Sequence, residues 1–495
     1  MQAKEPDRHP TDPAIPRGRL KERVTRGVAW SMAEKVGSTL LQIAVSLTIL
    51  RLLSREELGI MALLTAASAI AIVLSDSGFS QTLIRKKHPV QGEYKAVFGF
   101  NLFVSLLLYA FFVLTAPFAA DFYQIAALKE LAPVFFLILP INALSTVQNT
   151  LLVREFRFAT ISKITFFAAL ISGIAAIGLA LMGMGVWAIV MQRLIHMSLR
   201  SLLLWMVGGW KPSGKSNLRA LRQMAPYSCS LMATDLITTF YNKIPQFFLG
   251  RLYSADTLGS FDQAIKLKDQ PLTSVMQSVQ SVTFPALSNI RDEAARFAES
   301  YRQVVMVVCY VLFPVMIGLS AVAHDLFEVV LGEKWMPTVP YFEVVCLAGL
   351  FYPIGVVAYN VMKVKSDGKI IYRSEILKKV LMTVIFALTI PWSVQAVIWG
   401  LVLISFTEMA VNIICSSRFT TLKFGALWRT IRPIAAATLL MYAAVRGIAL
   451  LPIEQTFLHL LLQICGGAFC YLLTSVLFRM EAFAQLKEIL SRKKK

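Results

Sequence analysis

Residues 51–59, RLLSREELG, recur as residues 251–259, RLYSADTLG, with five of the nine positions identical. The first copy separates two apolar stretches, 27–53 and 58–84, and the second copy separates 224–250 from the next apolar stretch in the same way. A junction that occurs twice indicates two related bundles of helices. The apolar stretch before each copy is predicted to cross the membrane in the same direction. We therefore expect a parallel repeat of two six-helix lobes, followed by a final helix pair.

The composition is that of a membrane protein. Hydrophobic residues make up 56% of the 495 residues, charged residues make up 16%, and the mean hydropathy is +0.63. A helix needs roughly 20 apolar residues to cross a bilayer, and stretches of that length recur along the chain. They predict an all-α polytopic membrane protein with about fourteen transmembrane helices, over 27–53, 58–84, 96–118, 128–153, 160–184, 186–208, 224–250, 258–288, 303–332, 341–364, 371–392, 394–417, 430–451 and 455–478.

The positive charges give the predicted orientation. Lys and Arg in short loops stay on the cytoplasmic side, and most of the 49 Lys and Arg residues lie in the two tails and in every second loop. This alternation predicts that both ends are cytoplasmic, N-in and C-in. The predicted divisions are a disordered basic tail, an N-lobe, a C-lobe, a C-terminal helix pair and a second basic tail, over residues 1–26, 27–215, 216–425, 426–478 and 479–495.

The span 258–288 is polar in its first half. One side of its helix would carry five charged or amide side chains: Asp262, Lys266, Asp269, Gln270 and Gln277. Lys266 would lie about 12 Å from the outer end of the helix, towards the middle of the bilayer, where a charge needs water or protein around it. A competing interpretation makes 259–270 an amphipathic outer loop, with the helix starting at Pro271. The repeat favours the continuous span.

Other ionisable residues also fall inside predicted spans: Glu34, Lys35, Asp76, Arg193, His196, Asp235, Lys243 and Glu408. Each such group costs roughly 3 kcal/mol near a helix centre, so it faces an aqueous cavity or a partner. Lys35 and Asp235 occupy equivalent positions in the two copies, which predicts a cavity lined by the first two spans of each lobe. Alternatively these groups form fixed salt bridges or extend to the membrane surface. This alternative is strongest for Arg193, His196 and Glu408.

Several functional classes lack the residues that they need. The net charge of +20 is spread between apolar spans rather than gathered on one face with aromatic side chains, so we expect no nucleic-acid partner. We find no paired carboxylates, no nucleophile with its base and no phosphate-binding glycine loop, and the five histidines are scattered. We therefore predict a protein that is not an enzyme and has no catalytic residues, metal or cofactor. The six cysteines have the pattern of packing residues.

Six runs of the sequence are distinctive: GVAWSMAEKVGSTLLQ (27–42), RLLSREELG (51–59), LSDSGFSQTLIRKK (74–87), GVWAIVMQRL (185–194), FPALSNIRDE (284–293) and LGEKWMP (331–337). Together they resemble the lipopolysaccharide and colanic-acid exporters of the multidrug/oligosaccharidyl-lipid/polysaccharide (MOP) exporter superfamily, over about residues 22–420. Fourteen helices in two lobes, with polar first and second helices in each lobe, are similar to that superfamily as well.

The resemblance implies a flippase that works by alternating access. Its cargo would be an oligosaccharide repeat unit linked to a polyprenyl (undecaprenyl) pyrophosphate, moved from the cytoplasmic to the periplasmic leaflet of a bacterial inner membrane. The product would be a surface polysaccharide such as O-antigen, capsule or exopolysaccharide. Membrane lipid would hold the polyprenyl tail, and a polysaccharide polymerase with its chain-length machinery would be partner proteins.

The resemblance also implies roles for the charged groups. Three lysines would attract the pyrophosphate while polar side chains solvate the sugars, in a cavity of Lys35, Lys243, Lys266, Asp262, Asp269, Gln270 and Gln277. Carboxylates would bind a coupling proton or sodium ion: Glu34, Asp76 and Asp235.

Two other functions stay open at this point. Another branch of the superfamily exports drugs or the peptidoglycan lipid precursor. Drug exporters need mainly acidic and aromatic cavities, whereas the lysines here favour an anionic cargo. A membrane polysaccharide polymerase or ligase is the second alternative. Such an enzyme is expected to carry a large outer loop with essential arginines, and the outer loops predicted here are short and poor in charge.

Overall fold

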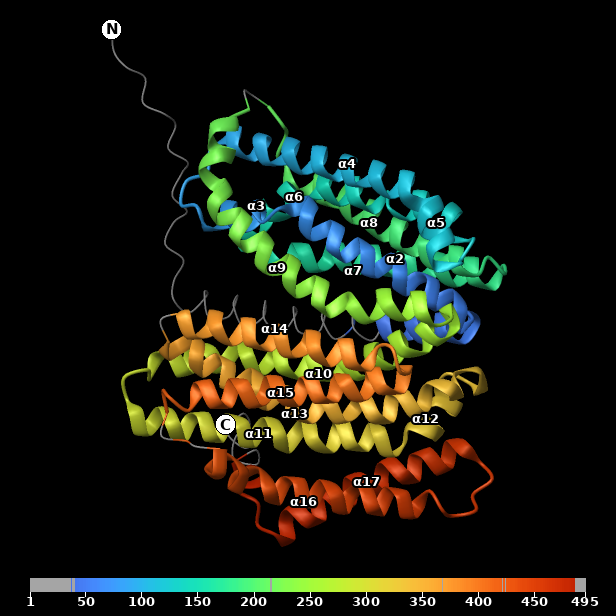
Figure 1. Ribbon diagram of the computed structural model, residues 1–495, viewed down its shortest axis with the longest axis vertical. Coiled ribbons are helices and arrows are strands. Elements are labelled where there is room, and N and C mark those ends of the chain that lie inside the picture. The colour runs from blue at the N-terminus through green and yellow to red at the C-terminus, as the bar shows by residue number, and fades with distance from the viewer. Residues whose placement is uncertain are drawn as a thin grey trace, which may run out of the picture. The chain divides into compact units, whose positions relative to one another are not determined.

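The computed structural model describes residues 37, 41–213, 216–366, 368–420, 422 and 424–485. Within these residues all regular secondary structure is helical, which confirms the all-α class (Figure 1). The predicted tail 1–26 and most of the tail 479–495 lie outside the described residues, as do Glu34 and Lys35.

The described helices match the predicted spans. In the part of the chain that the structure describes, nine helical segments are long and apolar enough to cross a membrane: α2 (Arg55–Asp76), α4 (Gln91–Tyr123), α5 (Leu128–Phe135) with α6 (Ile138–Arg154), α7 (Phe158–Leu181), α11 (Ala294–Ala321), η1 (Glu333–Thr338) with α13 (Val339–Lys365), α15 (Val394–Ser416), α16 (Phe424–Ile448) and α17 (Thr456–Leu477). The protein is therefore a multi-pass membrane protein.

The remaining predicted spans coincide with helices that are shorter or more polar. These are the N-terminal helix Leu41–Leu52, α8 (Val186–Gly208), α9 (Leu218–Leu252), α10 (Ala255–Asn289) and α14 (Lys369–Thr389). Two short helices, α3 (Phe79–Arg85) and α12 (Ala323–Val330), lie next to spans. That the polar helices also cross the membrane, which makes fourteen crossings with both ends inside, stays a prediction.

The two copies of the repeat start helices at equivalent positions. Before α2, Ser54 and Glu57 form a capping box, in which Ser54 Oγ accepts from Glu57 N at 3.2 Å and Glu57 Oε2 accepts from Ser54 N at 2.7 Å. Before α10, Ser254 Oγ accepts from Thr257 N at 3.2 Å. The helix then continues through Pro271 without a break. The interpretation that residues 259–270 form an outer loop is therefore wrong.

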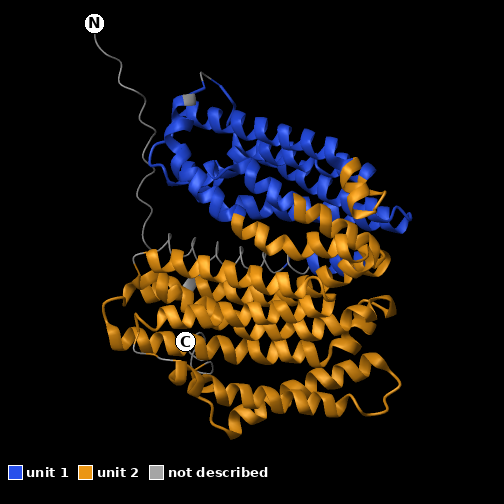
Figure 2. Cartoon of the chain, in the orientation of Figure 1, with its two compact units in different colours: residues 1–49, 68–116, 129–236 blue, residues 50–67, 117–128, 237–495 orange. Residues whose placement is uncertain are grey.

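The chain forms two compact units (Figure 2). Unit 1 comprises Met1–Ile49, Ser68–Ala116 and Lys129–Leu236, and within it α8 packs against α6 and α7. Unit 2 comprises Leu50–Ala67, Pro117–Leu128 and Ile237–Lys495. Its apolar core surrounds α13, which packs against α10, α11 and α15, while α16 packs against α11 and α17. The lobe boundaries expected from the sequence, near 215 and 425, stay a prediction.

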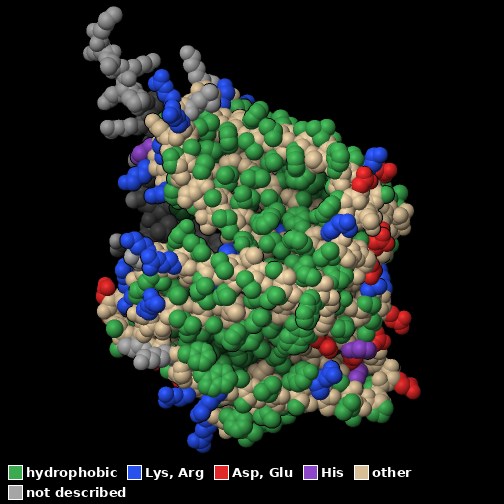
Figure 3. Space-filling view, in the orientation of Figure 1, with side chains coloured by type: hydrophobic (Ala, Val, Ile, Leu, Met, Phe, Trp, Pro, Cys, Tyr) green, Lys and Arg blue, Asp and Glu red, His purple; other side chains and the backbone are tan. Residues whose placement is uncertain are grey.

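On unit 2, hydrophobic side chains cover the middle of the face shown in Figure 3. Lys and Arg side chains gather near the left ends of its helices in the same view. A band of apolar surface suits contact with lipid tails, and charge at the helix ends suits contact with water and lipid head groups.

The run 331–337 closes the C-terminal end of the N-terminal helix. Lys334 Nζ donates to the carbonyl of Arg51 at 2.7 Å, and Trp335 Nε1 donates to the carbonyl of Leu50 at 2.9 Å. In return, Arg51 Nε donates to the carbonyl of Val330 at 2.7 Å. The last carbonyls of a helix lack partners within it. Lys334 and Trp335 therefore bind carbonyls at the end of the N-terminal helix, and Arg51 binds the last carbonyl of α12.

Within unit 2, α2 and α10 touch backbone to backbone at the last glycine of each copy of the repeat. A Cβ added to Gly59 would lie 1.8 Å from the carbonyl oxygen of Ala255, and one added to Gly259 would lie 1.9 Å from that of Arg55. Beside the contact, Arg55 pairs with Asp256 at 3.1 Å. The glycines thus permit an approach that a side chain would prevent.

We predict that Gly259→Ala separates α2 from α10 and destabilises the protein by at least about 1–3 kcal/mol, because the new methyl group has no room beside the backbone. Thermal unfolding of the purified protein in detergent checks this as a fall in Tm. Gly99→Ala in α4 is the matched control, since its added Cβ meets no described atom within 4 Å. Equal changes in Tm for the two variants would contradict the prediction.

Candidate functional site

The charged face of α10 is anchored by a buried carboxylate. Lys266 Nζ lies 2.6 Å from Asp262 Oδ2, one helical turn away. Gln246 of α9 donates from Nε2 to Asp262 Oδ1 at 3.3 Å. Asp262 is 5% exposed, whereas the side chain of Lys266 is 50% exposed. The buried carboxylate therefore holds an exposed ammonium group on the surface of the helix.

The polar side chains of α10 continue this face over several turns. The exposed ones follow each other at intervals of three or four residues: Lys266, Gln270, Thr273 and Gln277. Asp269 is half-buried and pairs with Lys268 at 2.6 Å. Leu272 and Met276 point the other way, into the core of unit 2. A polar face of this length within a membrane needs water or a polar ligand beside it, because lipid tails offer no hydrogen bonds.

The other predicted site residues lie in two places. Lys243 is half-buried on α9 in unit 2. Asp76 and Asp235 both belong to unit 1, where their charges are close enough to act on each other. Asp76 Oδ1 accepts a hydrogen bond from Ser80 Oγ, and Asp235 is exposed. Within unit 1 the structure thus brings together two of the three carboxylates predicted for ion coupling.

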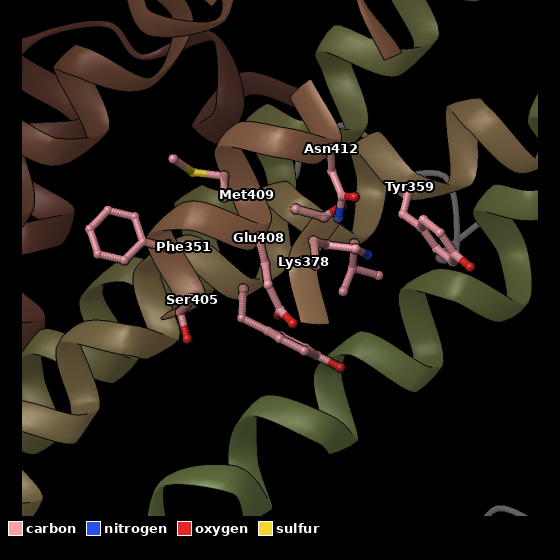
Figure 4. A pocket seen from close by; sticks show the side chains of 10 residues that line it. Phe351, Tyr359, Lys378, Ser405, Glu408, Met409 and Asn412 are labelled. Atoms are coloured by element: carbon pink, nitrogen blue, oxygen red, sulfur yellow. The ribbon is translucent and has the colours of Figure 1, made fainter. Parts of the chain in front are cut away.

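A second polar site lies between α13, α14 and α15, in a pocket of about 130 Å³ (Figure 4). Glu408 of α15 and Lys378 of α14 line it together with Tyr359. Lys378 Nζ lies 2.5 Å from Glu375 and 4.9 Å from the centre of the Tyr359 ring. The sequence analysis singled out Glu408 and missed Lys378. The signal that it overlooked is the spacing of Glu375 and Lys378, which suits an ion pair on one face of a helix.

The small volume limits what this pocket can hold. Asn412 Nδ2 donates to the carbonyl of Gly355 at 3.1 Å, and its buried Oδ1 has no hydrogen-bonding partner among the described residues. A pocket of this size holds a few water molecules, and ligand sites for larger molecules are roughly 300–1,000 Å³. Lys378, which pairs with Glu375, places an ammonium group at the pocket as well. The pocket therefore suits water better than a sugar or an added cation.

Comparison with known proteins identifies the family. Residues 49–340 match the family described as polysaccharide biosynthesis protein. The chain belongs to this family.

Curated relatives match this chain over most of its length. The teichuronic acid biosynthesis protein TuaB of Bacillus subtilis is 24% identical over 96% of this chain and 99% of its own length. The succinoglycan biosynthesis transport protein ExoT of Rhizobium meliloti is 24% identical over 86% of both chains. The lipopolysaccharide biosynthesis protein WzxC of Escherichia coli is 22% identical over 72% of this chain and 73% of its own.

Two solved structures show the same fold at low sequence identity. The lipid II flippase MurJ, in an inward closed conformation, superimposes with a TM-score of 0.72 at 13% identity and covers 91% of this chain and 99% of its own. A multidrug resistance MATE transporter of the MOP superfamily, facing inward, gives a TM-score of 0.59 at 16% identity, over 79% of this chain and 96% of its own. This protein thus has a MurJ-like fold.

We predict that Asp262 and Lys266 are energetically coupled by roughly 0.5–1 kcal/mol, a modest value because half of the Lys266 side chain is exposed. Asp262→Asn, Lys266→Met and the double variant form the cycle, with unfolding in detergent as the measurement. The double variant should lose less stability than the sum of the single variants. Additive losses would contradict the prediction.

The control cycle uses Glu293→Gln and Arg296→Met. This pair is 3.2 Å apart, but both of its side chains are more than half exposed. Surface pairs of this kind contribute little to stability, so we expect no measurable coupling between Glu293 and Arg296.

Proposed function

We propose that this protein is a flippase for a polyprenyl-pyrophosphate-linked oligosaccharide. In this proposal it moves the repeat unit of a surface polysaccharide from the cytoplasmic to the periplasmic leaflet of a bacterial inner membrane. The observation that carries the proposal is the polar face of α10, on which the exposed ammonium group of Lys266 is followed by uncharged polar side chains. A lysine attracts the pyrophosphate, and amide and hydroxyl groups form hydrogen bonds with sugars.

Family membership supports this cargo. The relative ExoT is named as a succinoglycan biosynthesis transport protein, and the relative WzxC is named as a lipopolysaccharide biosynthesis protein. The α13–α15 pocket is too small for an oligosaccharide, so of the two sites described above the α10 face is the better candidate. Lys243 of α9 belongs to the same unit and would add a second cation, while the polyprenyl tail stays in the lipid.

We propose further that the protein works by alternating access coupled to a proton or sodium ion. The fold that it shares with a flippase and with a MATE transporter supports two lobes that move about a central cavity. The coupling ion would bind at Asp76 and Asp235, whose carboxylates act on each other electrostatically within unit 1. Carboxylates that repel each other favour a bound cation, and ion binding would bias which side is open.

The test is complementation of a strain that lacks this protein, with wild type or Lys266→Glu. Losing one charge-assisted contact of about 1.5–3 kcal/mol slows transport by roughly tenfold or more. We expect Lys266→Glu to lose most surface polysaccharide and to accumulate lipid-linked repeat units in the cytoplasmic leaflet. Both quantities are measured with the variant present in the membrane at wild-type levels.

Lys129→Glu is the matched control, because it reverses an exposed lysine of α5 outside both polar sites. It should support wild-type levels of polysaccharide. A normal amount of surface polysaccharide in the Lys266→Glu strain would show that the α10 face does not bind the cargo. A deletion strain with intact polysaccharide but impaired handling of the peptidoglycan lipid precursor, or impaired drug export, would show that the cargo is wrong.

A further inference from the structure

A larger cavity lies away from both polar sites described above. It has a volume of about 600 Å³ and is lined by residues of α11, α12, α13, α16 and α17 of unit 2. Two histidines, three carboxylates and one arginine line it: His324, Asp325, Glu328, Glu343, Arg446 and His459. In Figure 3, histidine side chains lie beside acidic ones near the right ends of α12 and α17. In the predicted topology this is the outer side of the membrane.

Metal-ligating atoms converge at one wall of this cavity. The ligand atoms of His324, Asp325 and Glu328 all lie within 4.8 Å of one another. His459 of α17 approaches from the other side, with Nδ1 2.8 Å from Asp325 Oδ2. His324 Nδ1 is 3.3 Å from Asp325 Oδ1. Each oxygen of the Asp325 carboxylate therefore faces an imidazole nitrogen.

The hydrogen bonds of His459 suit a metal ligand. Its Nε2 lies 3.0 Å from the carbonyl oxygen of Ile448, which can only accept, so Nε2 carries the hydrogen and donates. Nδ1 lies within hydrogen-bonding distance of Asp325 Oδ2, so without a metal it donates to the carboxylate, and a bound metal ion would take the place of that hydrogen. A histidine that binds a metal commonly donates its other N–H to a backbone carbonyl, because this bond fixes the ring and its tautomer.

A buried amide orients the central carboxylate. Gln463 lines the same cavity and is 2% exposed. Its Nε2 donates to Asp325 Oδ2 at 2.8 Å. Hydrogen bonds to a ligating carboxylate hold it in the orientation that a metal ion needs.

The charge balance favours a cation over an anion. Three carboxylates, those of Asp325, Glu328 and Glu343, face a single guanidinium, that of Arg446, which lies 3.9 Å from Glu343. The two histidines add nitrogen ligands. A donor set of two imidazoles and two carboxylates is typical of zinc, whereas calcium and magnesium prefer oxygen ligands alone.

We propose that His324, Asp325, Glu328 and His459 form a divalent transition-metal site, best suited to Zn²⁺, which links α12 to the C-terminal helix pair. Tetrahedral zinc ligands lie about 3.3 Å apart, and His324 Nδ1 lies 3.9 Å from Glu328 Oε2, so the exposed His324 and Glu328 side chains would rotate towards the ion when it binds. The ion would hold α17 against α12 on the outer side. This site is separate from the α10 face and does not depend on the proposed cargo.

The test measures zinc binding to the full-length protein in detergent, purified through an affinity tag that contains no histidine. Titration calorimetry with ZnCl₂ should give one site per chain, and MgCl₂ should give none. Asp325→Asn and His459→Gln should weaken zinc binding by at least about tenfold. His324→Ala should weaken it as well, and its side chain is 63% exposed, so folding is not at risk.

The matched control is His88→Ala, which removes an exposed histidine from unit 1. It should bind zinc as wild type does. The proposal is overturned if wild type binds no zinc, or if the three site variants bind it as tightly as wild type. In either case the cluster is a hydrogen-bonded link between α12 and α17 that binds no metal. Size-exclusion profiles identify any variant that has lost its fold.

Discussion

A charged group inside a membrane must face water or lie against an opposite charge, because the hydrocarbon core can solvate neither charges nor polar backbone groups. This constraint explains why α10 is organised as it is. Asp262 is buried against Lys266 and Gln246, while the lysine and the amides that follow it along the helix remain exposed. A helix of 35 residues satisfies most of its backbone internally, except where Pro271 and Pro285 lack an N–H, and leaves the polar side chains for an aqueous space or a ligand.

A direct backbone contact between α2 and α10 holds α10 in position. Gly59 and Gly259 let the backbones of α2 and α10 meet, with Arg55 and Asp256 paired alongside. The helices begin at their serine caps a few residues earlier, so capping and close approach are encoded in the same nine residues of each copy. The run 331–337 then ties the end of the N-terminal helix to α12 by exchanging hydrogen bonds with it. These short segments therefore carry the contacts that orient the longer ones.

The three polar regions of unit 2 differ in ways that set their chemistry. The α10 face is exposed and carries a lysine beside uncharged polar groups, which suits an extended anionic and sugar-containing ligand. The α13–α15 pocket is small, so it suits water. The cavity beside α12 and α17 has excess negative charge and two histidines, which suits a cation.

The sequence by itself determined the helical class, the approximate positions of the helices, the equivalent junctions at 51–59 and 251–259 and the polar residues that share one side of α10. Hydropathy, repeated motifs and helical spacing are local properties, so they can be read along the chain. Only the tertiary structure decided that Gly59 meets Gly259, that Lys378 lines a pocket with Glu408, and that His459 meets Asp325. The histidines looked scattered in the sequence, although His324, Asp325 and Glu328 lie within one turn of α12. Their partner comes from a helix more than a hundred residues later, and only packing brings such distant residues together.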